Sequence, residues 1–384
     1  MADDVAVASV KVEGIETFSN VELVEVEDDD RLIDKATVVF DDVDGIAAAT
    51  MLEQRQVVIE LGWTSEQARV FEGIVWRVKT QARSDPSGSK QRVTLVALDL
   101  SYKLNQGAGA AKVYPPGKLS DILTSIIAPY QIPIGQIKLV EDPEFTDDAP
   151  LIQGPKTDWA FIQELAVQYG ARAFVEVNND TSQFYFVSEK FFLDGDSMGQ
   201  ITYVYGTSPL MEFTYQRVAS GAAPVSSTIV TDPVTGQAAA KQGTAPPPEA
   251  PLSADPDEKA SLDKLGTGAG TVYSDAVDVV SKSAGQAEDA RAKANVFGLP
   301  SDPDLGDSAI QQDPTRALGF LGHGVAVGNV NIRAKGKITI AGIAPWANGD
   351  WYVRRVNHQV TRGVGVDRHG DARGTYRTRF TVTR

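Results

Sequence analysis

The chain has 384 residues, of which 42% are hydrophobic and 23% are charged, and its formal net charge at pH 7 is -15. This length allows two or three domains with their own cores, and the composition is that of a soluble globular protein. The absence of cysteine excludes disulfides and thiolate metal sites, and the overall negative charge disfavours general binding to nucleic acid.

The two ends of the chain differ in charge. Residues 1–60 carry 16 acidic and 4 basic side chains, whereas residues 331–384 carry 11 Lys and Arg against three Asp. This asymmetry is compatible with solubility alone. It is also compatible with electrostatic complementarity, either between domains or head to tail between chains.

The N-terminal ten residues, MADDVAVASV, contain no basic segment and no long apolar core, so we expect no signal peptide. No run of about 18 apolar residues occurs in the sequence, so we also expect no membrane-spanning helix.

The first hundred residues predict about six strands and little helix. Alternating or β-branched runs occupy residues 6–12, 21–26 and 36–40, and the apolar stretch from residue 57 to 106 contains three more strand-like runs. This strand density is typical of a barrel or sandwich. We interpret Asp28-Asp29-Asp30, between two of the runs, as a solvated loop and not as a cation site.

A turn at Asp85-Pro86-Ser87-Gly88 predicts a long hairpin of residues 71–80 and 91–100. Its first strand has apolar residues on both faces, with Ile74 and Trp76 on one face and Val75 on the other. A strand that is apolar on both faces is buried on both. One face would pack a barrel core, and the other would need another domain or another subunit.

An α+β segment follows. Apolar residues recur at helical spacing over residues 119–127. A second helix is expected to begin after the cap residue Thr157 and to end at Gly170. The polar turn at residues 178–182 then predicts another hairpin, and residues 209–217 predict one more strand.

The composition changes at residue 218. Residues 218–269 are rich in Ala, Pro, Gly, Ser and Thr, which indicates a linker, and residues 272–297 show an Ala-rich helical pattern. We interpret the acidic residues Asp302, Asp304 and Asp307 as a solvated loop, because Pro303 interrupts the spacing of a calcium site. The β pattern returns in four further strands and a turn at Ala347-Asn348-Gly349-Asp350, with the strands expected at residues 324–330, 335–343, 351–360 and 376–382.

No catalytic set is apparent. The sequence contains no Gly-x-Ser-x-Gly and no His-Glu-x-x-His, and residues 107–112 lack the context of a phosphate loop. We interpret His358 as a structural histidine, Glu164 as a surface residue, and Asp194 and Asp196 as turn residues. The sequence therefore predicts no catalytic residue, no cofactor-binding residue, no cofactor and no metal site.

One block is specific enough to suggest a family. Residues 157–172 read TDWAFIQELAVQYGAR, and residues 71–75, 96–101, 349–353 and 356–358 support the same comparison. Together they resemble the baseplate hub proteins of contractile tails, which include the phage late control D type and the hub portion of the type VI secretion spike. The resemblance covers about residues 1–217 and 318–384.

The resemblance implies a mainly β fold with an α+β part. It implies a first tube-like β-barrel over residues 1–106, an α+β domain over 107–206, and a second barrel from 207–217 plus 318–384. Residues 218–317 would then be a flexible and helical insertion in the second barrel, longer than the family pattern needs.

The implied function is that of a structural, non-enzymatic hub. It would be a homotrimer that joins a hexameric tail tube above to a trimeric spike below, in a phage baseplate or contractile injection particle assembled in the bacterial cytoplasm. Because the sequence holds no needle or lysozyme module, we expect the spike to be a separate protein. Other baseplate proteins, and cargo in the lumen, are further expected partners.

Two alternatives stay open. A tail-associated peptidoglycan hydrolase would need an acid in an apolar pocket, and Glu164 is the mild candidate for that acid. A receptor-binding or carbohydrate-binding β-module would need exposed aromatic side chains on loops. The tryptophans Trp63, Trp76, Trp159 and Trp351 are instead expected in or beside strands and a helix.

Overall fold

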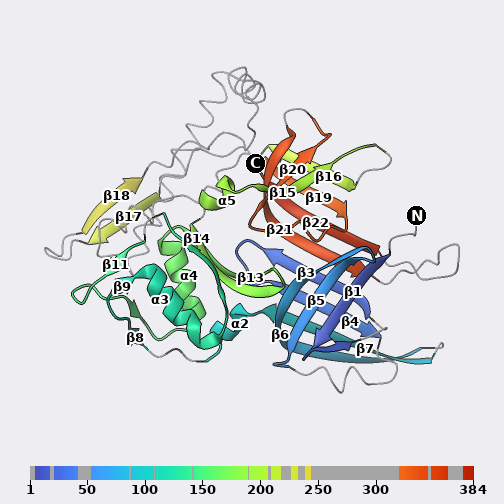
Figure 1. Cartoon of the computed structure of the whole chain (residues 1–384), viewed down its shortest axis with the longest axis horizontal. Coiled ribbons are helices and arrows are strands. Elements are labelled where there is room, and N and C mark those ends of the chain that lie inside the picture. Colours follow the sequence, from blue (N-terminus) through green and yellow to red (C-terminus); the bar gives the residue numbers. More distant parts are fainter. Residues whose placement is uncertain are drawn as a thin grey trace.

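The structure is a computed structural model of the chain (Figure 1). The residues it describes are 5–17, 21–41, 53–85, 88–107, 109, 111–140, 142–188, 190–205, 209–217, 226–231, 238–243, 320–344, 347–361 and 375–384. Within this part of the chain, no helix is both long enough and apolar enough to cross a membrane.

Most strands belong to a single 13-stranded sheet, in the order β16-β19-β22-β21-β3-β4-β7-β6-β5-β1-β2, with β20 on β21 and β15 on β20. Its N-terminal strands are β1 (Ala6–Val12), β2 (Ile15–Thr17), β3 (Val21–Asp29), β4 (Lys35–Asp41), β5 (Gln56–Trp63), β6 (Glu66–Asp85) and β7 (Gly88–Asp99). Its later strands are β15 (Ser197–Thr202), β16 (Leu210–Arg217), β19 (Phe320–Val327), β20 (Lys337–Ala341), β21 (Gly349–Thr361) and β22 (Thr375–Thr383).

Two groups of strands in this sheet repeat one order. The first unit runs β3-β4-β7-β6-β5 and the second runs β16-β19-β22-β21-β20, and all neighbours in both are antiparallel. In each unit the first two strands along the chain are neighbours, and the last three follow in reverse order. The units meet edge to edge where β21 pairs with β3, from Arg355↔Asp29 to Thr361↔Leu23.

The α+β part lies beside the sheet (Figure 1). A three-stranded sheet, β10-β14-β13, packs with α3 and α4 in one apolar cluster that includes Leu123, Ile162 and Phe186. Its elements are α2 (Ser101–Leu104), β8 (Lys112–Val113), β9 (Gly117–Lys118), α3 (Leu119–Ile127), η1 (Ala128–Tyr130), β10 (Ile134–Lys138), β11 (Glu144–Phe145), β12 (Ile152–Gln153), α4 (Asp158–Gln168), β13 (Ala171–Asn178), β14 (Thr181–Ser188) and α5 (Lys190–Asp194).

The two helices predicted in the α+β segment are confirmed as α3 and α4. The Thr157 hydroxyl accepts a hydrogen bond from the Ala160 N–H at 3.2 Å, which satisfies one of the free donors at the start of α4. Gly170 follows the helix with φ +56°, a left-handed conformation that glycine adopts without strain. The β13–β14 hairpin turns through Asn179 and Asp180, which both have positive φ, as a two-residue hairpin turn requires.

The mainly β fold with an α+β part is also confirmed. Among the described strands no barrel is closed, so the two-barrel architecture and the domain boundaries stay predictions. Part of the predicted insertion forms a hairpin of β17 (Ser226–Thr231) and β18 (Ala238–Gly243), whereas the helix predicted at 272–297 and the acidic residues at 302–307 lie outside the described residues.

The predicted double burial of β6 ends at Val75, before Trp76. Ile74 packs into the α+β cluster and Val75 into the core of the first β-unit, so another part of the same chain covers the second face there. Directly afterwards a β-bulge separates Val75 from Arg77 in the pairing with β7. Trp76 lies in this bulge and is 44% exposed, because a bulge re-aims the side chains of its strand.

Candidate functional site, a buried ionic junction

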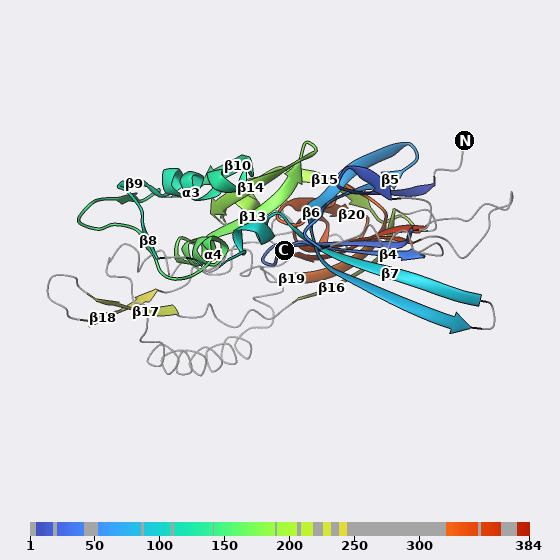
Figure 2. The same cartoon turned by 90° about the horizontal axis from the view of Figure 1, so that it is seen from below.

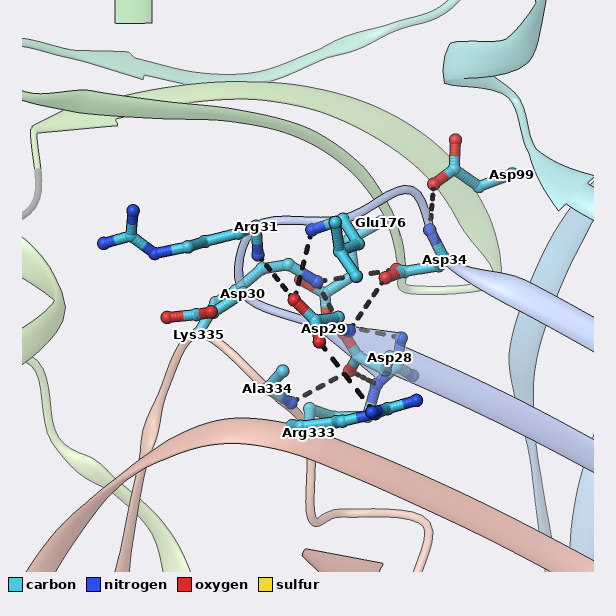
Figure 3. Close-up of polar contacts among 12 residues, drawn as sticks. Asp28, Asp29, Asp30, Arg31, Asp34, Asp99, Glu176, Arg333, Ala334 and Lys335 are labelled. Atoms are coloured by element: carbon cyan, nitrogen blue, oxygen red, sulfur yellow. Dashed lines mark hydrogen bonds and ion pairs between the residues drawn. The ribbon is translucent and has the colours of Figure 1, made fainter. Parts of the chain in front are cut away.

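Six charged side chains meet where the two β-units and the α+β part come together (Figure 3). Asp28 is the last but one residue of β3, Asp34 precedes β4 and Asp99 ends β7. Glu176 comes from β13, and the segment before β20 supplies two cations, Arg333 and Lys335. We call this group the ionic junction, and its members are Asp28, Asp34, Asp99, Glu176, Arg333 and Lys335.

Lys335 is the central cation of the ionic junction. Its Nζ lies 2.5 Å from Asp28 Oδ1 and 3.5 Å from Asp34 Oδ2, and the side chains of all three are at least nine-tenths buried. Asp28 also receives the Ala334 N–H at 2.9 Å and Arg333 Nε at 3.3 Å. The second β-unit is thus tied to the end of β3 through both backbone and side chains.

The α+β part is held by two further pairs. Arg333 Nη2 lies 3.2 Å from Glu176 Oε1 on β13. Arg172, also on β13, lies 3.0 Å from the Asp30 carboxylate, and both side chains are buried. The charged residues of β13 therefore contact two different parts of the chain, and every one of these contacts links residues that are more than 100 positions apart.

Burial and charge set the protonation of the ionic junction. Burial raises the pKa of Asp99 to about 6, although hydrogen bonds from Ser101 and the Asp34 N–H favour its charged form. Burial also raises the pKa of Asp34 and of Glu176. Burial opposes the charged form of Asp28 as well, but Lys335 and Arg333 hold the pKa of Asp28 below its usual value.

The interpretation of Asp28-Asp29-Asp30 as a solvated loop is wrong. Asp28 and Asp30 are buried, and Asp29 accepts the N–H groups of Arg31 and Leu32 at 2.9 and 3.1 Å, which shapes the turn. One hint of this burial was present in the sequence, because the acidic first sixty residues and the basic end suggested complementarity. The pairs of Asp28 and Asp34 with Arg333 and Lys335 confirm that complementarity between parts of one chain.

His358 is a structural histidine, as predicted. It is 1% exposed, its Nε2 lies 3.0 Å from the Ile332 carbonyl, and its Nδ1 lies 2.9 Å from the Tyr376 hydroxyl. Burial, reinforced by the nearby Arg333, lowers the pKa of His358 to about 4. The neutral ring therefore donates to Ile332 and accepts from Tyr376.

Asp158, which belongs to the block at residues 157–172 that suggested the family, also has a structural role. Asp158 accepts hydrogen bonds from Gln153 Nε2 at 2.8 Å and from the Tyr130 hydroxyl at 2.7 Å, and it pairs with Lys112 at 3.2 Å. A carboxylate at this position also favours the positive end of the α4 dipole. Asp158 therefore joins the segments on both sides of α3 to α4.

The hydrolase candidates do not form a site. The Glu164 side chain is 59% exposed and pairs with Lys156, whereas His358 is buried in the other part of the fold. Asp194 ends α5, and Asp196 lies in the exposed connection to β15, as expected for turn residues. Within the described ranges, no three His, Asp or Glu side chains are arranged to hold a metal ion.

A hollow of about 330 Å³ lies on the polar face of the second β-unit. It contains Glu212 of β16, His323 of β19, Arg355 of β21 and Arg379 of β22. Arg355 pairs with Glu27, and Arg379 donates to Gln359 Oε1 at 3.0 Å, so these cations already have partners inside the chain. The hollow is part of the polar surface of the sheet and has no set of convergent catalytic groups.

Comparison with known proteins identifies solved structures that share this fold. No protein-family model and no curated protein matches the chain. Among solved structures, a tail protein of Neisseria meningitidis MC58 is 11% identical, with a TM-score of 0.57 over 99% of this chain and 96% of that one. The 43 kDa tail protein of prophage MuSo2 from Shewanella oneidensis is 9% identical, with a TM-score of 0.56 over 99% and 98%.

The chain has the fold of these tail proteins. The E. coli c3393 protein, a component of the type VI secretion system, is similar too, at 12% identity and a TM-score of 0.53 over 97% of this chain and 76% of that one. The resemblance indicated by residues 157–172 is thus confirmed at the level of the fold.

The first prediction concerns Lys335. Replacing it in a Lys335→Met variant leaves Asp28, Asp34 and Glu176 with Arg333 as their remaining cation in the ionic junction. We expect a loss of about 3–5 kcal/mol in the free energy of unfolding, because one partner of a buried ion pair is removed. Urea denaturation followed by tryptophan fluorescence measures this loss.

The control is Lys11→Met, because Lys11 pairs with Glu60 at 3.0 Å near the surface. That change should cost less than about 1 kcal/mol. Adding Asp28→Asn to Lys335→Met should recover part of the stability, since it removes one uncompensated charge. Equal losses for Lys335→Met and Lys11→Met would contradict the role given to the ionic junction.

The second prediction concerns pH and His358. The folded pKa of about 4 lies below the usual value of 6.5, so the stabilisation from neutral His358 is complete above pH 6.5 and is lost as the pH falls towards 4. Between pH 7 and pH 5 we expect a loss of about 2 kcal/mol in the free energy of unfolding from this group. In a His358→Gln variant, which keeps a donor and an acceptor, this part of the loss should disappear.

Comparing the wild type with His358→Gln is necessary because Asp99 acts in the opposite direction. Its raised pKa of about 6 favours folding at low pH and disfavours it as the pH rises. The difference in stability between the two proteins should therefore change by about 2 kcal/mol between pH 7 and pH 5, to the disadvantage of the wild type. An unchanged difference between them from pH 7 to pH 5 would show that His358 does not titrate as its burial implies.

Proposed function

We propose that this protein is the structural hub of a contractile tail or contractile injection system, a homotrimer that joins a hexameric tube to a trimeric spike. The observation that carries the proposal is the repeat of one strand order in two β-units, joined edge to edge by β21 and β3. Tail proteins that share this fold along nearly their whole length support it.

Symmetry explains why two units per chain suit this role. A ring of three chains would present six similar β-units to a partner with six-fold symmetry, while the chain as a whole keeps three-fold symmetry for the partner on the other side. The ionic junction contributes by fixing the second unit and the α+β part to the first unit. The six units would thus have defined relative positions, with no bond chemistry involved.

The hydrolase alternative has less support. Glu164 is solvent-exposed and paired with Lys156, so it lacks the apolar surroundings that raise the pKa of a catalytic acid. The receptor-binding alternative is supported by two exposed aromatic residues after β15, Tyr203 and Tyr205, at 39% and 92% exposure. Trp159 and Trp351 are buried in apolar clusters, and no cleft lined by aromatic side chains accompanies Tyr205 among the described pockets.

The third prediction concerns assembly. The purified full chain, or the protein counted in purified particles, should give a copy number of three, which corresponds to three times the 41.2 kDa of one chain. Mass photometry and quantitative mass spectrometry against the tube protein measure this number. A copy number of six, or a position away from the tube–spike junction in particle images, would refute the proposal.

The fourth prediction separates the hub from the hydrolase. The purified wild-type protein should release no fragments from peptidoglycan, and Glu164→Gln should not differ from it. Glu164 is the informative position because it is exposed and its replacement leaves the fold intact, whereas His358→Ala would also destabilise the core. Lysis by the wild type that is lost in Glu164→Gln would establish the hydrolase instead.

A further inference from the structure

β6 of the first unit and β21 of the second unit change partners at equivalent points. Val75 donates its N–H to the Arg55 carbonyl and accepts the Gln54 N–H, both at 2.8 Å. Val353 donates its N–H to the Gly336 carbonyl at 2.8 Å and accepts the Lys335 N–H at 3.0 Å. A β-bulge follows immediately in both strands, between Val75 and Arg77 and between Val353 and Arg355.

The local backbone repeats as well. Gln54 and Lys335, which make these equivalent hydrogen bonds, have φ values of +67° and +65°. Few residues other than glycine adopt such values, so their occurrence at the same point of both units is specific. The two units are therefore equivalent residue by residue in this region, and Val75 corresponds to Val353.

Beyond the bulge the two strands differ in what they contact. β21 pairs with β3 from Arg355 to Thr361. β6 continues from Arg77 to Asp85, and within the described residues it pairs there with β7 alone, because β5 reaches only as far as Ile74. The β6–β7 ribbon projects from the rest of the sheet (Figure 2). One edge of β6 thus presents unpaired backbone groups, as edge strands do.

β16 is the complementary edge. It corresponds to β3, since each is the first strand of its unit and each has a bulge at its start, between Leu210 and Glu212 and between Val21 and Leu23. Whereas β3 lies between β4 and β21, β16 ends the sheet and pairs with β19 alone in the described part of the chain. Met211 at the start of β16 is 50% exposed.

We propose that β6, beyond its bulge, pairs antiparallel with β16 of a second copy of this chain, as β21 pairs with β3 within one chain. This inference rests on the proposed function and names the surface through which the copies join. Two different edges are used, so the contact is heterologous and generates a closed ring when the rotation between copies closes. Strand addition at a sheet edge supplies the affinity through main-chain hydrogen bonds.

The free edge of β6 begins with side chains that this contact would cover. Arg77 and Lys79 on β6 are exposed, and Lys79 would lie beside the exposed Gln216 of β16. Trp76 lies at the beginning of the free edge with Arg77 Cζ 5.0 Å from its ring centre, and it occupies the position of Arg354, whose carbonyl accepts the Asp30 N–H at the β21–β3 contact. Trp76 would therefore be covered in the assembly, which accounts for an exposed tryptophan beside Arg77.

The equivalence of the two β-units also defines which residues of β6 and β16 would lie opposite each other. Within the chain, Asn357 of β21 lies opposite Glu27 of β3. Transferred to the contact between copies, this pair becomes Lys79 of β6 opposite Gln216 of β16. The Asp30 N–H to Arg354 carbonyl bond makes Asn357 and Glu27 a non-hydrogen-bonded pair, by the alternation of antiparallel ladders. Cα atoms in such pairs are about 4.5 Å apart, which is within the range of a disulfide.

The fifth prediction uses this register. Because the chain has no cysteine, a Lys79→Cys, Gln216→Cys double variant contains only the two engineered thiols. Under mild oxidation of the purified full chain, it should give covalent dimers and trimers in non-reducing electrophoresis. The matched control is Lys79→Cys with Tyr215→Cys, which moves one thiol by one residue to the other face of β16, and it should cross-link at least tenfold less.

A second control tests the reference contact. Glu27→Cys with Asn357→Cys should lose its free thiols while it stays at the mass of one chain, because this pair lies within one copy. The same oxidations are carried out on native particles that carry the variants, and mass photometry gives the copy number in each case. Cross-linked trimers from the Lys79 and Gln216 pair, and not from the shifted pair, are the expected result.

The outcomes separate the two proposals. A copy number of three without the Lys79–Gln216 cross-link overturns this inference and leaves the hub function standing. Cross-linking of Lys79→Cys particles to the tube protein, and not to a second copy of this chain, also overturns it. A single copy per particle, with no cross-link between chains, overturns both the inference and the hub.

Discussion

The pairing of β21 with β3 is the contact on which the rest of the structure depends, because it brings the last part of the chain to the edge of the first. Backbone hydrogen bonds between two edge strands carry little specificity on their own, since many strands satisfy an edge equally well. The specificity comes from the ionic junction at the end of β3, where Asp28 meets Arg333 and Lys335. A shift of register would separate these buried charges, which is costly when a charge loses its partner.

The ionic junction contains four carboxyl groups and two cations. Burial raises the pKa of Asp34, Asp99 and Glu176, and the neighbouring carboxylates raise the pKa of Asp34 and Glu176 further. An apolar junction of the same size could be equally stable, because buried ion pairs gain little net energy over well-packed apolar groups. Its charges instead define one arrangement of the two β-units and the α+β part. A defined arrangement matters for a protein whose proposed role is to position similar units around an axis.

Several side chains of types that often perform chemistry have structural partners in this fold. Residues that usually perform chemistry are used structurally, as with neutral His358 between Ile332 and Tyr376, and Asp158 among Gln153, Tyr130 and Lys112. The groups left available are backbone edges and exposed side chains such as Trp76, and these are suited to protein contacts. This distribution is consistent with the tail proteins that share the fold.

The sequence alone determined the local elements. The bounds of α3, the Thr157 cap, the β13–β14 turn and the long β6–β7 hairpin followed from spacing, capping and turn residues, which act within a few positions. The specific block at 157–172 also indicated the family of folds. Only the tertiary structure decided that Asp28 is buried and paired, because its partners lie some 300 residues away. The local pattern of three Asp is that of a solvated loop. The residue-by-residue match between β6 and β21 could likewise not be predicted from the sequence. It consists of bulges and backbone dihedral angles, which residues with different side chains can adopt.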